Sequence, residues 1–131
     1  MKILILGAGR VGSSLASTLS KQQYEVSIVD LNKDRLQRLQ EDLDLATEVG
    51  HGSYPNTLKK VGADEETILL AVTNSDECNI TSCQIAKSKF NVKKTICRLS
   101  DAQYLDSLSA FGENNIDIAI SPENEVTEHL V

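Results

Sequence analysis

The stretch KILILGAGRVG, residues 2–12, decides the fold that this chain predicts. Its apolar residues 3–6 form the continuous run that is typical of a strand buried on both faces. The spacing of Gly7, Gly9 and Gly12 then permits a sharp turn, close approach of a pyrophosphate to the backbone, and close packing of a following helix. The stretch therefore predicts a strand, a phosphate-binding glycine turn and a helix, against the alternative of a glycine turn that serves packing only.

The helix after the turn is indicated by Val11, Leu15 and Leu19, which recur at the spacing of one helical face. The first amide groups of a helix lack intrahelical acceptors and lie at the positive end of its dipole, so they favour an anion. We therefore expect the main-chain N–H groups of residues 8–11 to hold phosphates. The residues predicted to contact the phosphates are Gly7, Ala8, Gly9, Arg10 and Val11.

Asp30 ends the next predicted strand, residues 25–30, and follows Gly12 by 18 residues. A carboxylate at this distance can accept hydrogen bonds from the two hydroxyls of an adenosine ribose, whereas it would repel a 2′-phosphate. This pattern predicts NAD or NADH as the ligand, with ATP or ADP as the alternative. The residues do not rank these nucleotides, because all of them present the same adenosine diphosphate half to the turn and to Asp30.

The remaining segments alternate between helices and strands. Asn32 can cap a helix with Leu36, Leu39 and Leu43 inside and Lys33, Arg35 and Arg38 outside. A helix begins at Pro55 and ends at Gly62, and another has an apolar face from Ile80 to Phe90. Ser100 and Gln103 have capping-box spacing before a helix with Tyr104, Leu108 and Phe111 on one side. The further strands are predicted at residues 45–49, 67–72, 95–99 and 116–120, and a last helix begins at residues 121–122.

Six strands that alternate with helices predict a doubly wound parallel α/β sheet, a Rossmann fold, in the order 3-2-1-4-5-6 with right-handed crossovers. Ligands of such sheets bind at the carboxyl ends of the strands, where the strand order reverses. Thr73, Asn74 and Arg98 follow or end strands and should meet the glycine turn there. We expect Thr73 and Asn74 to contact the second ribose or the outer phosphate, and Arg10 and Arg98 to contact phosphate oxygens.

Arg98 and His51 each have two interpretations. Arg98 could instead form an ion pair with one of the many carboxylates of the chain. His51, in the GHGS loop at residues 50–53, suits a loop histidine that bonds the backbone better than it suits a catalytic base.

Composition narrows the class of protein. The chain has 131 residues, the size of about one domain, with 13 basic and 19 acidic residues and a net charge of -6. This charge argues against binding to nucleic acid or to an anionic membrane surface. No apolar segment reaches the length of a membrane span, so we expect no direct membrane insertion. The three cysteines have no C-x-x-C pair and only two histidines accompany them, which predicts free thiols, no metal site and a cytoplasmic location.

Patterns of catalytic residues are missing from the sequence. No tyrosine has a lysine four residues later, no Cys-His or Ser-His-Asp arrangement stands out, and the chain has no second domain to enclose a substrate. We therefore expect no catalytic residues and a nucleotide that acts as a signal, which can still do work if it prefers one of two conformations. The alternative is a small NAD-dependent oxidoreductase or its cofactor-binding domain.

Four motifs together are more specific than the glycine turn alone: GAGRVG at residues 7–12, VDLN at 29–32, GHGS at 50–53 and AVTNSDECNI at 71–80. With them the whole chain resembles the RCK family of domains that regulate potassium conductance, and within it the amino-terminal domain of the regulatory subunits of bacterial Trk potassium uptake. The resemblance implies a cytosolic, peripheral protein at the inner face of the membrane.

The resemblance also implies a ligand, partners and a place in a longer protein. The ligand would be NAD, NADH or an adenine nucleotide, and the protein would control a membrane potassium transporter of the Trk type as part of a homo-oligomer, a dimer or a tetrameric ring. Residues 1–131 would be the first nucleotide-binding domain of a protein with two such repeats. The family's contacts fall on Gly7 to Val11, Asp30, Thr73, Asn74 and Arg98.

Overall fold

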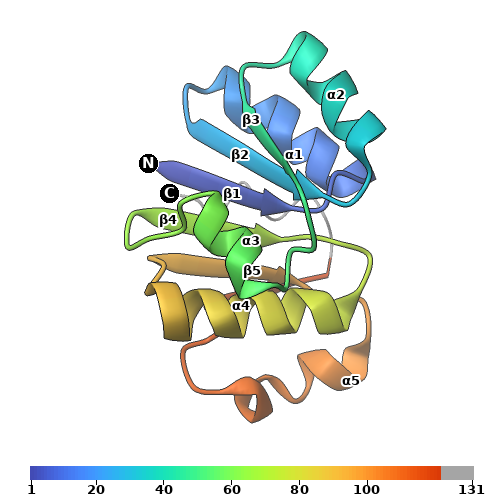
Figure 1. Cartoon of the computed structure of the whole chain (residues 1–131). Coiled ribbons are helices and arrows are strands. Elements are labelled where there is room, and N and C mark those ends of the chain that lie inside the picture. Colours follow the sequence, from blue (N-terminus) through green and yellow to red (C-terminus); the bar gives the residue numbers. More distant parts are fainter. Residues whose placement is uncertain (122–131) are drawn as a thin grey trace.

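The computed structural model describes residues 1–121 and shows helices packed on both faces of one sheet (Figure 1). The strands are β1 (Lys2–Leu6), β2 (Glu25–Asp30), β3 (Ala46–Val49), β4 (Thr67–Ala71), β5 (Lys94–Arg98) and β6 (Ile118–Ile120). The helices are α1 (Arg10–Lys21), α2 (Lys33–Asp42), α3 (Pro55–Lys60), α4 (Asp76–Phe90) and α5 (Ala102–Leu105), with a 3₁₀ turn, η1 (Leu108–Phe111).

The sheet has the order β3-β2-β1-β4-β5-β6 and every pairing is parallel, which confirms the predicted Rossmann fold. β1 lies between β2 and β4, with Lys2 opposite Glu25 on one side and opposite Thr67 on the other. From β1 the chain adds β2 and β3 on one side of the sheet, and then β4, β5 and β6 on the other side. The strand order therefore reverses between the neighbours β1 and β4. All six strands therefore end at one edge of the sheet, and the crevice of such folds lies above β1 and β4.

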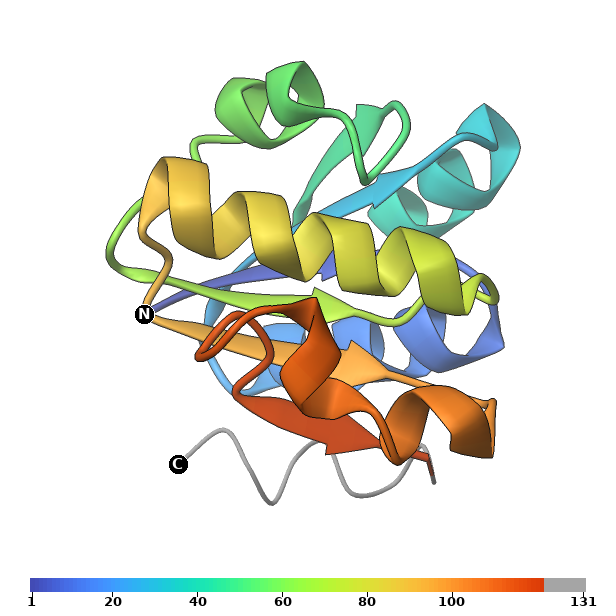
Figure 2. The same cartoon turned by 90° about the horizontal axis from the view of Figure 1, so that it is seen from below.

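Each face of the sheet has its own apolar core. Residues Ile3 and Ile5 of β1 face the cluster that includes α1 and α2, whereas Leu4 and Leu6 face the cluster that includes α3 and α4. Figure 2 shows α1 and α4 on opposite sides of the sheet. Because both faces are covered, β1 and β4 are apolar along nearly their whole length, as expected for central parallel strands.

Local signals that the sequence predicted are present at the helix ends. The Asn32 side chain accepts a hydrogen bond from the Arg35 amide (3.2 Å) and caps α2. Pro55 is the first residue of α3, where its missing N–H costs no helical hydrogen bond. Gly62 follows this helix with a φ of +79°, a left-handed conformation that favours glycine. The cap of α4, which was not predicted, is Ser75, whose hydroxyl oxygen accepts from the Cys78 amide (3.2 Å).

The segment before β6 corrects one prediction. The expected single helix through residues 104–111 is instead two short turns, α5 and η1. Its cap is Asp101, whose side chain accepts from the Gln103 amide (2.9 Å), and not Ser100. The reason is that the Ser100 and Asp101 amides both donate to the Asp76 carboxylate of α4, which draws Ser100 into the preceding loop.

Smaller differences lie at strand ends. β3 begins at Ala46 and β6 at Ile118, so both are shorter than the predicted strands 45–49 and 116–120. The helix predicted from residues 121–122 onward lies outside the described residues.

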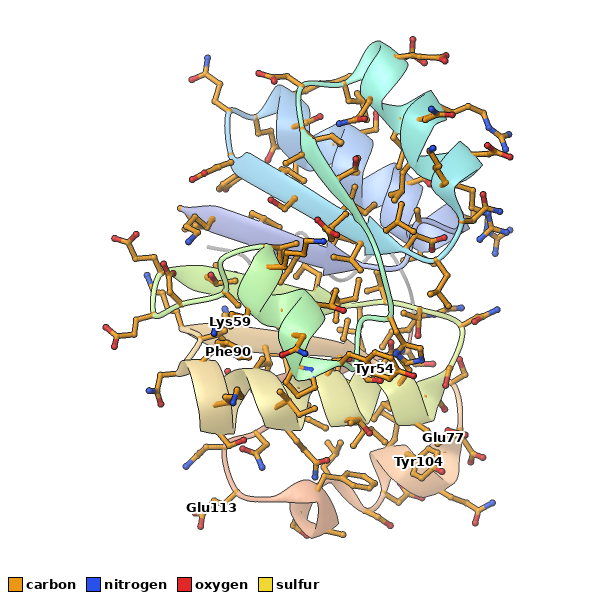
Figure 3. The ribbon with its side chains drawn as sticks, viewed as in Figure 1. Tyr54, Lys59, Glu77, Phe90, Tyr104 and Glu113 are labelled. Carbon is orange, nitrogen blue, oxygen red and sulfur yellow. The ribbon has the colours of Figure 1, made fainter. Side chains whose placement is uncertain are left out.

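On the α4 face, the Glu77 carboxylate lies beside Tyr104 of α5 and raises the pKa of that phenol (Figure 3).

Candidate functional site

The glycine turn has the geometry that the sequence predicted. Gly7 has a φ of +105°, and a Cβ there would lie 3.0 Å from the Cα of Thr73, so the ends of β1 and β4 nearly touch. At Gly12 a Cβ would lie 1.6 Å from the Gly7 carbonyl oxygen, which means that α1 packs directly on the turn. At Gly9, by contrast, a Cβ would meet nothing within 4 Å. The turn is therefore crowded at both ends and open in its middle.

Gly9 is also the N-cap of α1, and no side chain caps this helix. The first amide groups of a helix have no acceptors within it, so the open space beside Gly9 is bordered by donors at the positive end of a helix dipole. A phosphate group suits both properties of this place, the free volume beside Gly9 and the positive end of the helix dipole.

Asp30 joins the turn to the start of α2. Its Oδ1 accepts from the Ala8 amide (2.8 Å) and its Oδ2 from the Asn32 amide (2.7 Å). The Ala8 amide thus has a partner within the protein, in place of the phosphate that the sequence prediction assigned to it. A carboxylate has about four acceptor positions, so Asp30 retains the capacity to accept from ribose hydroxyls.

Two hollows meet above β1 and β4. One, the β2-side hollow, has a volume of about 370 Å³ and extends from Gly7 over Asp30 to the loop of residues 50–52 and to Cys78. The other, the α1-side hollow, has a volume of about 320 Å³ and extends from the glycine turn to Arg10, Val11 and Arg98.

The two hollows share residues at their junction: Gly7, Asp30, Arg35, Thr73 and Asn74. Every predicted binding residue other than Ala8 lines at least one of them. Residues far apart in the sequence therefore come together at one cleft, as the topology requires.

Thr73, Asn74 and Arg98 form the wall of this cleft on the side of β4 and β5. The Arg98 guanidinium donates from Nη1 to the Thr73 carbonyl (3.3 Å), and both residues are half-buried. Asn74 is exposed at the rim. This hydrogen bond holds the positively charged Arg98 guanidinium at the end of β4, beside the α1-side hollow.

The GHGS loop forms the opposite wall. His51 Nδ1 accepts from the Ser53 amide (3.2 Å) and lies 2.7 Å from the Ser53 hydroxyl. The structure therefore gives His51 the backbone-bonding role. Its ring stacks on Tyr54 with centroids 4.5 Å apart, and Tyr54 lies exposed on the α4 side of the sheet (Figure 3). A Cβ on Gly52 would lie 3.2 Å from Leu6, so the loop packs on the central strand.

Sequence reasoning missed Arg35, which it placed on the outer side of α2. The structure places Arg35 at the junction of the two hollows, because α2 begins only three residues after Asp30 and its first turn faces the cleft. A guanidinium there suits an anionic ligand. The sequence signal that could have placed Arg35 at the cleft was the short loop between Asp30 and the helix cap Asn32. Leu31 and Ser75, which also line the β2-side hollow, had no signal of their own.

The described part of the chain has neither a metal-binding cluster nor a membrane-spanning helix. Within residues 1–121, no group of three or more His, Cys, Asp or Glu side chains could hold a metal ion. No helix in that part of the chain combines the length and apolar character that crossing a bilayer requires.

The three cysteines differ in access, which leads to a prediction. Cys78 is partly exposed in the β2-side hollow, whereas Cys83 and Cys97 are fully buried, and the hydrogen bond from Cys97 together with burial raises the pKa of the Cys83 thiol. Since the thiolate is the reactive form, we expect a disulfide reagent to modify Cys78 quickly and the other two only after unfolding.

The measurement is thiol labelling with Ellman's reagent in native and denaturing buffer. Saturating NADH should slow the fast phase, because a ligand in the cleft covers Cys78. The Cys78→Ser variant serves as the control and should lose that phase. A fast phase that survives in Cys78→Ser would contradict the assignment.

Comparison with known proteins identifies sequence relatives of this chain. The chain is 42% identical over 132 residues to the Trk system potassium uptake protein TrkA of Halomonas elongata, and 41% identical over 133 residues to that of Vibrio alginolyticus. Each alignment covers 99% of this chain but only 29% of the relative. The chain therefore spans less than a third of the length of these relatives.

Solved structures share the fold at lower identity. The NAD(P)-binding domain of an exopolyphosphatase-related protein from Archaeoglobus fulgidus superimposes with a TM-score of 0.78, 17% identity, and coverage of 96% of this chain and 91% of that one. The GsuK channel bound to NAD gives a TM-score of 0.72 at 18% identity, covering 91% of this chain and 21% of that one. The GsuK structure bound to ADP gives 0.71 at 18% identity, with coverage of 91% and 30%.

The family assignment follows from a match that spans almost the whole chain. The family model for the TrkA-N domain matches residues 3–122, which include the glycine turn and all of the sheet apart from Lys2 at the start of β1. This chain therefore belongs to the TrkA-N domain family.

Proposed function

We propose that this chain is a nucleotide-sensing regulatory domain, which binds NAD or NADH in the cleft above β1 and β4 and controls a membrane potassium uptake transporter. The observation that carries the proposal is the cleft itself, where the open glycine turn, Asp30 and the Arg35 and Arg98 guanidiniums meet. The names of the relatives from Halomonas and Vibrio, which are Trk system potassium uptake proteins, support potassium uptake as the process that is controlled.

The residues fit an adenine dinucleotide in a definite orientation. The β2-side hollow, with Asp30 and the GHGS loop, takes the adenosine; the space beside Gly9 takes the pyrophosphate; and the wall of Thr73, Asn74 and Arg98 takes the second ribose. ATP and ADP share the first two of these places and are the competing ligands. The GsuK structures with NAD and with ADP support this pair of candidates.

The domain acts in the cytoplasm at the inner face of the membrane, through contact with the transporter and within a homo-oligomer. In this role the nucleotide is sensed and not consumed. A ligand regulates in this way when it binds two conformations with different affinity, and the coupling is typically about 1 to 3 kcal/mol.

Calorimetry combined with a turnover assay tests the proposal. Purified protein should bind NADH, NAD, ATP or ADP saturably, and should leave NADH unoxidised across a panel of carbonyl substrates. Oxidation of NADH would favour the oxidoreductase alternative, and the absence of binding by any of the four nucleotides would reject the sensing function.

The proposed contact between the Asp30 carboxylate and the adenosine half of NADH leads to a testable prediction. Asp30→Ala should weaken NADH binding by about 1.5 to 3 kcal/mol, the scale of hydrogen bonds to a charged group. The variant also releases the Ala8 and Asn32 amides, so its melting temperature is measured alongside the calorimetry. Asp34→Ala removes the same charge from an exposed position on α2 and is the control, which should bind like the original chain. A loss in Asp30→Ala below a few tenths of a kcal/mol would remove this residue from the site.

A further inference from the structure

Asn79, on the second turn of α4, is a buried polar residue that sequence reasoning did not select. Its side chain has a relative exposure of 0%. The amide oxygen accepts from the Thr73 backbone N–H (3.0 Å) and from the Thr73 hydroxyl (2.7 Å). The amide nitrogen donates to the Thr73 carbonyl (3.0 Å) and to the Arg98 carbonyl (2.9 Å). A carboxamide offers two donor hydrogens and two acceptor lone pairs, so all four are used.

These four bonds lie where the pairing of β4 with β5 stops. The last paired residues are Ala71 and Cys97, and Thr73 and Arg98 follow them. Beyond the ladder, the Asn79 carboxamide takes the place of the backbone hydrogen bonds that would otherwise join the two strand ends. The Thr73 carbonyl also accepts from Arg98 Nη1 (3.3 Å), so one oxygen ties the amide and the guanidinium together.

A second side chain of α4 strengthens the same connection. The Asp76 carboxylate accepts from the Ser100 amide (2.9 Å) and the Asp101 amide (2.9 Å), just after β5. The start of α4 therefore holds the backbone at Arg98, through Asn79, and just after Arg98, through Asp76. Asn79 differs from Asp76 in that it is fully buried and contacts residues that line the cleft.

We propose that Asn79 is a positioning residue for the ligand, which sets Thr73 and Arg98 for the part of a dinucleotide that extends past the pyrophosphate. The inference rests on the proposed function, because it deepens the description of the same cleft. Of these two residues, Arg98 lines only the α1-side hollow, whereas Thr73 lies at the junction and lines both hollows. Loosening the strand ends therefore weakens the binding of NADH more than the binding of ADP, because the adenosine diphosphate half also keeps its contacts with Asp30 and the glycine turn.

The ratio of two dissociation constants separates positioning from simple stabilisation. Calorimetry with NADH and with ADP is carried out on the original chain and on Asn79→Asp, which has nearly the same shape but presents an oxygen to two carbonyl oxygens. We expect the Kd for NADH divided by the Kd for ADP to rise about tenfold, the equivalent of one or two hydrogen bonds.

Ser82→Ala is the matched control for this experiment. Ser82 is also fully buried on α4, but its hydroxyl bonds only within the helix, to the Cys78 carbonyl (2.7 Å). Its loss should lower the melting temperature slightly and leave the ratio unchanged. An unchanged ratio in folded Asn79→Asp, or the same rise in Ser82→Ala, would overturn the positioning role.

A measurement on the original chain keeps the test independent of folding of the variant. In a ¹⁵N-labelled sample the side-chain amide resonances of Asn79 should shift on addition of NADH and stay in place on addition of ADP. Equal responses to both nucleotides, or binding of ADP without binding of NADH, would overturn the inference. Failure of the original chain to bind either nucleotide rejects the proposed function instead, so the two failures are distinguishable.

Discussion

Gly9→Val should abolish nucleotide binding and leave the fold intact. The backbone at Gly9 has a φ of -75° and a ψ of -160°, an extended conformation that valine adopts readily, and a Cβ there meets nothing within 4 Å. The valine methyl groups would occupy the space beside the first amides of α1, where the pyrophosphate is expected. We expect no saturable binding of NADH in calorimetry at about 100 times the original Kd, a loss of more than about 2.7 kcal/mol.

The control for Gly9→Val is its thermal stability. Valine is a poorer N-cap than glycine, which costs at most about 1 kcal/mol and lowers the melting temperature by about 3 to 5 °C. Circular dichroism should therefore show a folded protein at the temperature of the binding experiment. Unchanged affinity for NADH in this folded variant would contradict the assignment of phosphates to the turn.

Gly12→Ala should have the opposite effect and prevent the chain from folding stably. Helix propensity alone predicts a gain of about 1 kcal/mol, because alanine is a better helix former than glycine. The structure predicts a loss, since the new Cβ would lie 1.6 Å from the Gly7 carbonyl oxygen and 2.7 Å from its carbon. Both are backbone atoms, so α1 itself must move off the turn. We expect a loss above about 4 kcal/mol, in the range of severe core disruptions.

Thermal and urea unfolding measure this loss. Ser14→Ala, on the exposed side of the same helix, is the matched control and should change the free energy of unfolding by about 0.5 kcal/mol or less. A Gly12→Ala protein as stable as the original would show that α1 can shift, and would contradict the close packing described above. Together the two variants distinguish Gly9, where the missing side chain leaves space for a ligand, from Gly12, where the missing side chain lets α1 pack on the turn.

The sequence was sufficient for the fold because its signals were local and agreed with one another. Apolar runs marked β1 and β4 as central strands, and Asn32, Pro55 and Gly62 marked the helix ends. Once the strands alternate with helices, the handedness of crossovers leaves few arrangements, and the predicted order was the observed one. The positions of Asp30, Thr73 and Arg98 at the cleft followed from the same topology.

The rest depended on side-chain contacts between distant segments. Ser100 and Asp101 are both acceptable caps, and only the Asp76 carboxylate, 24 residues from Ser100, decides between them. Arg35 has the same spacing as the exposed residues of α2, and its place in the cleft depends on how α2 is set against β2. For Asn79, nothing in the helical pattern indicated that its amide spans two strand ends. Such contacts leave no periodic trace in a sequence.

The parallel arrangement has a practical consequence for building a nucleotide biosensor from this domain. All six strands run toward the cleft, so the loops at residues 62–66 and 91–93 enter β4 and β5 from the far edge of the sheet, where Lys2 pairs with Asp64. A fluorescent reporter inserted into either loop would stand a full strand length away from the ligand. The reporter would therefore not block entry of the nucleotide into the cleft.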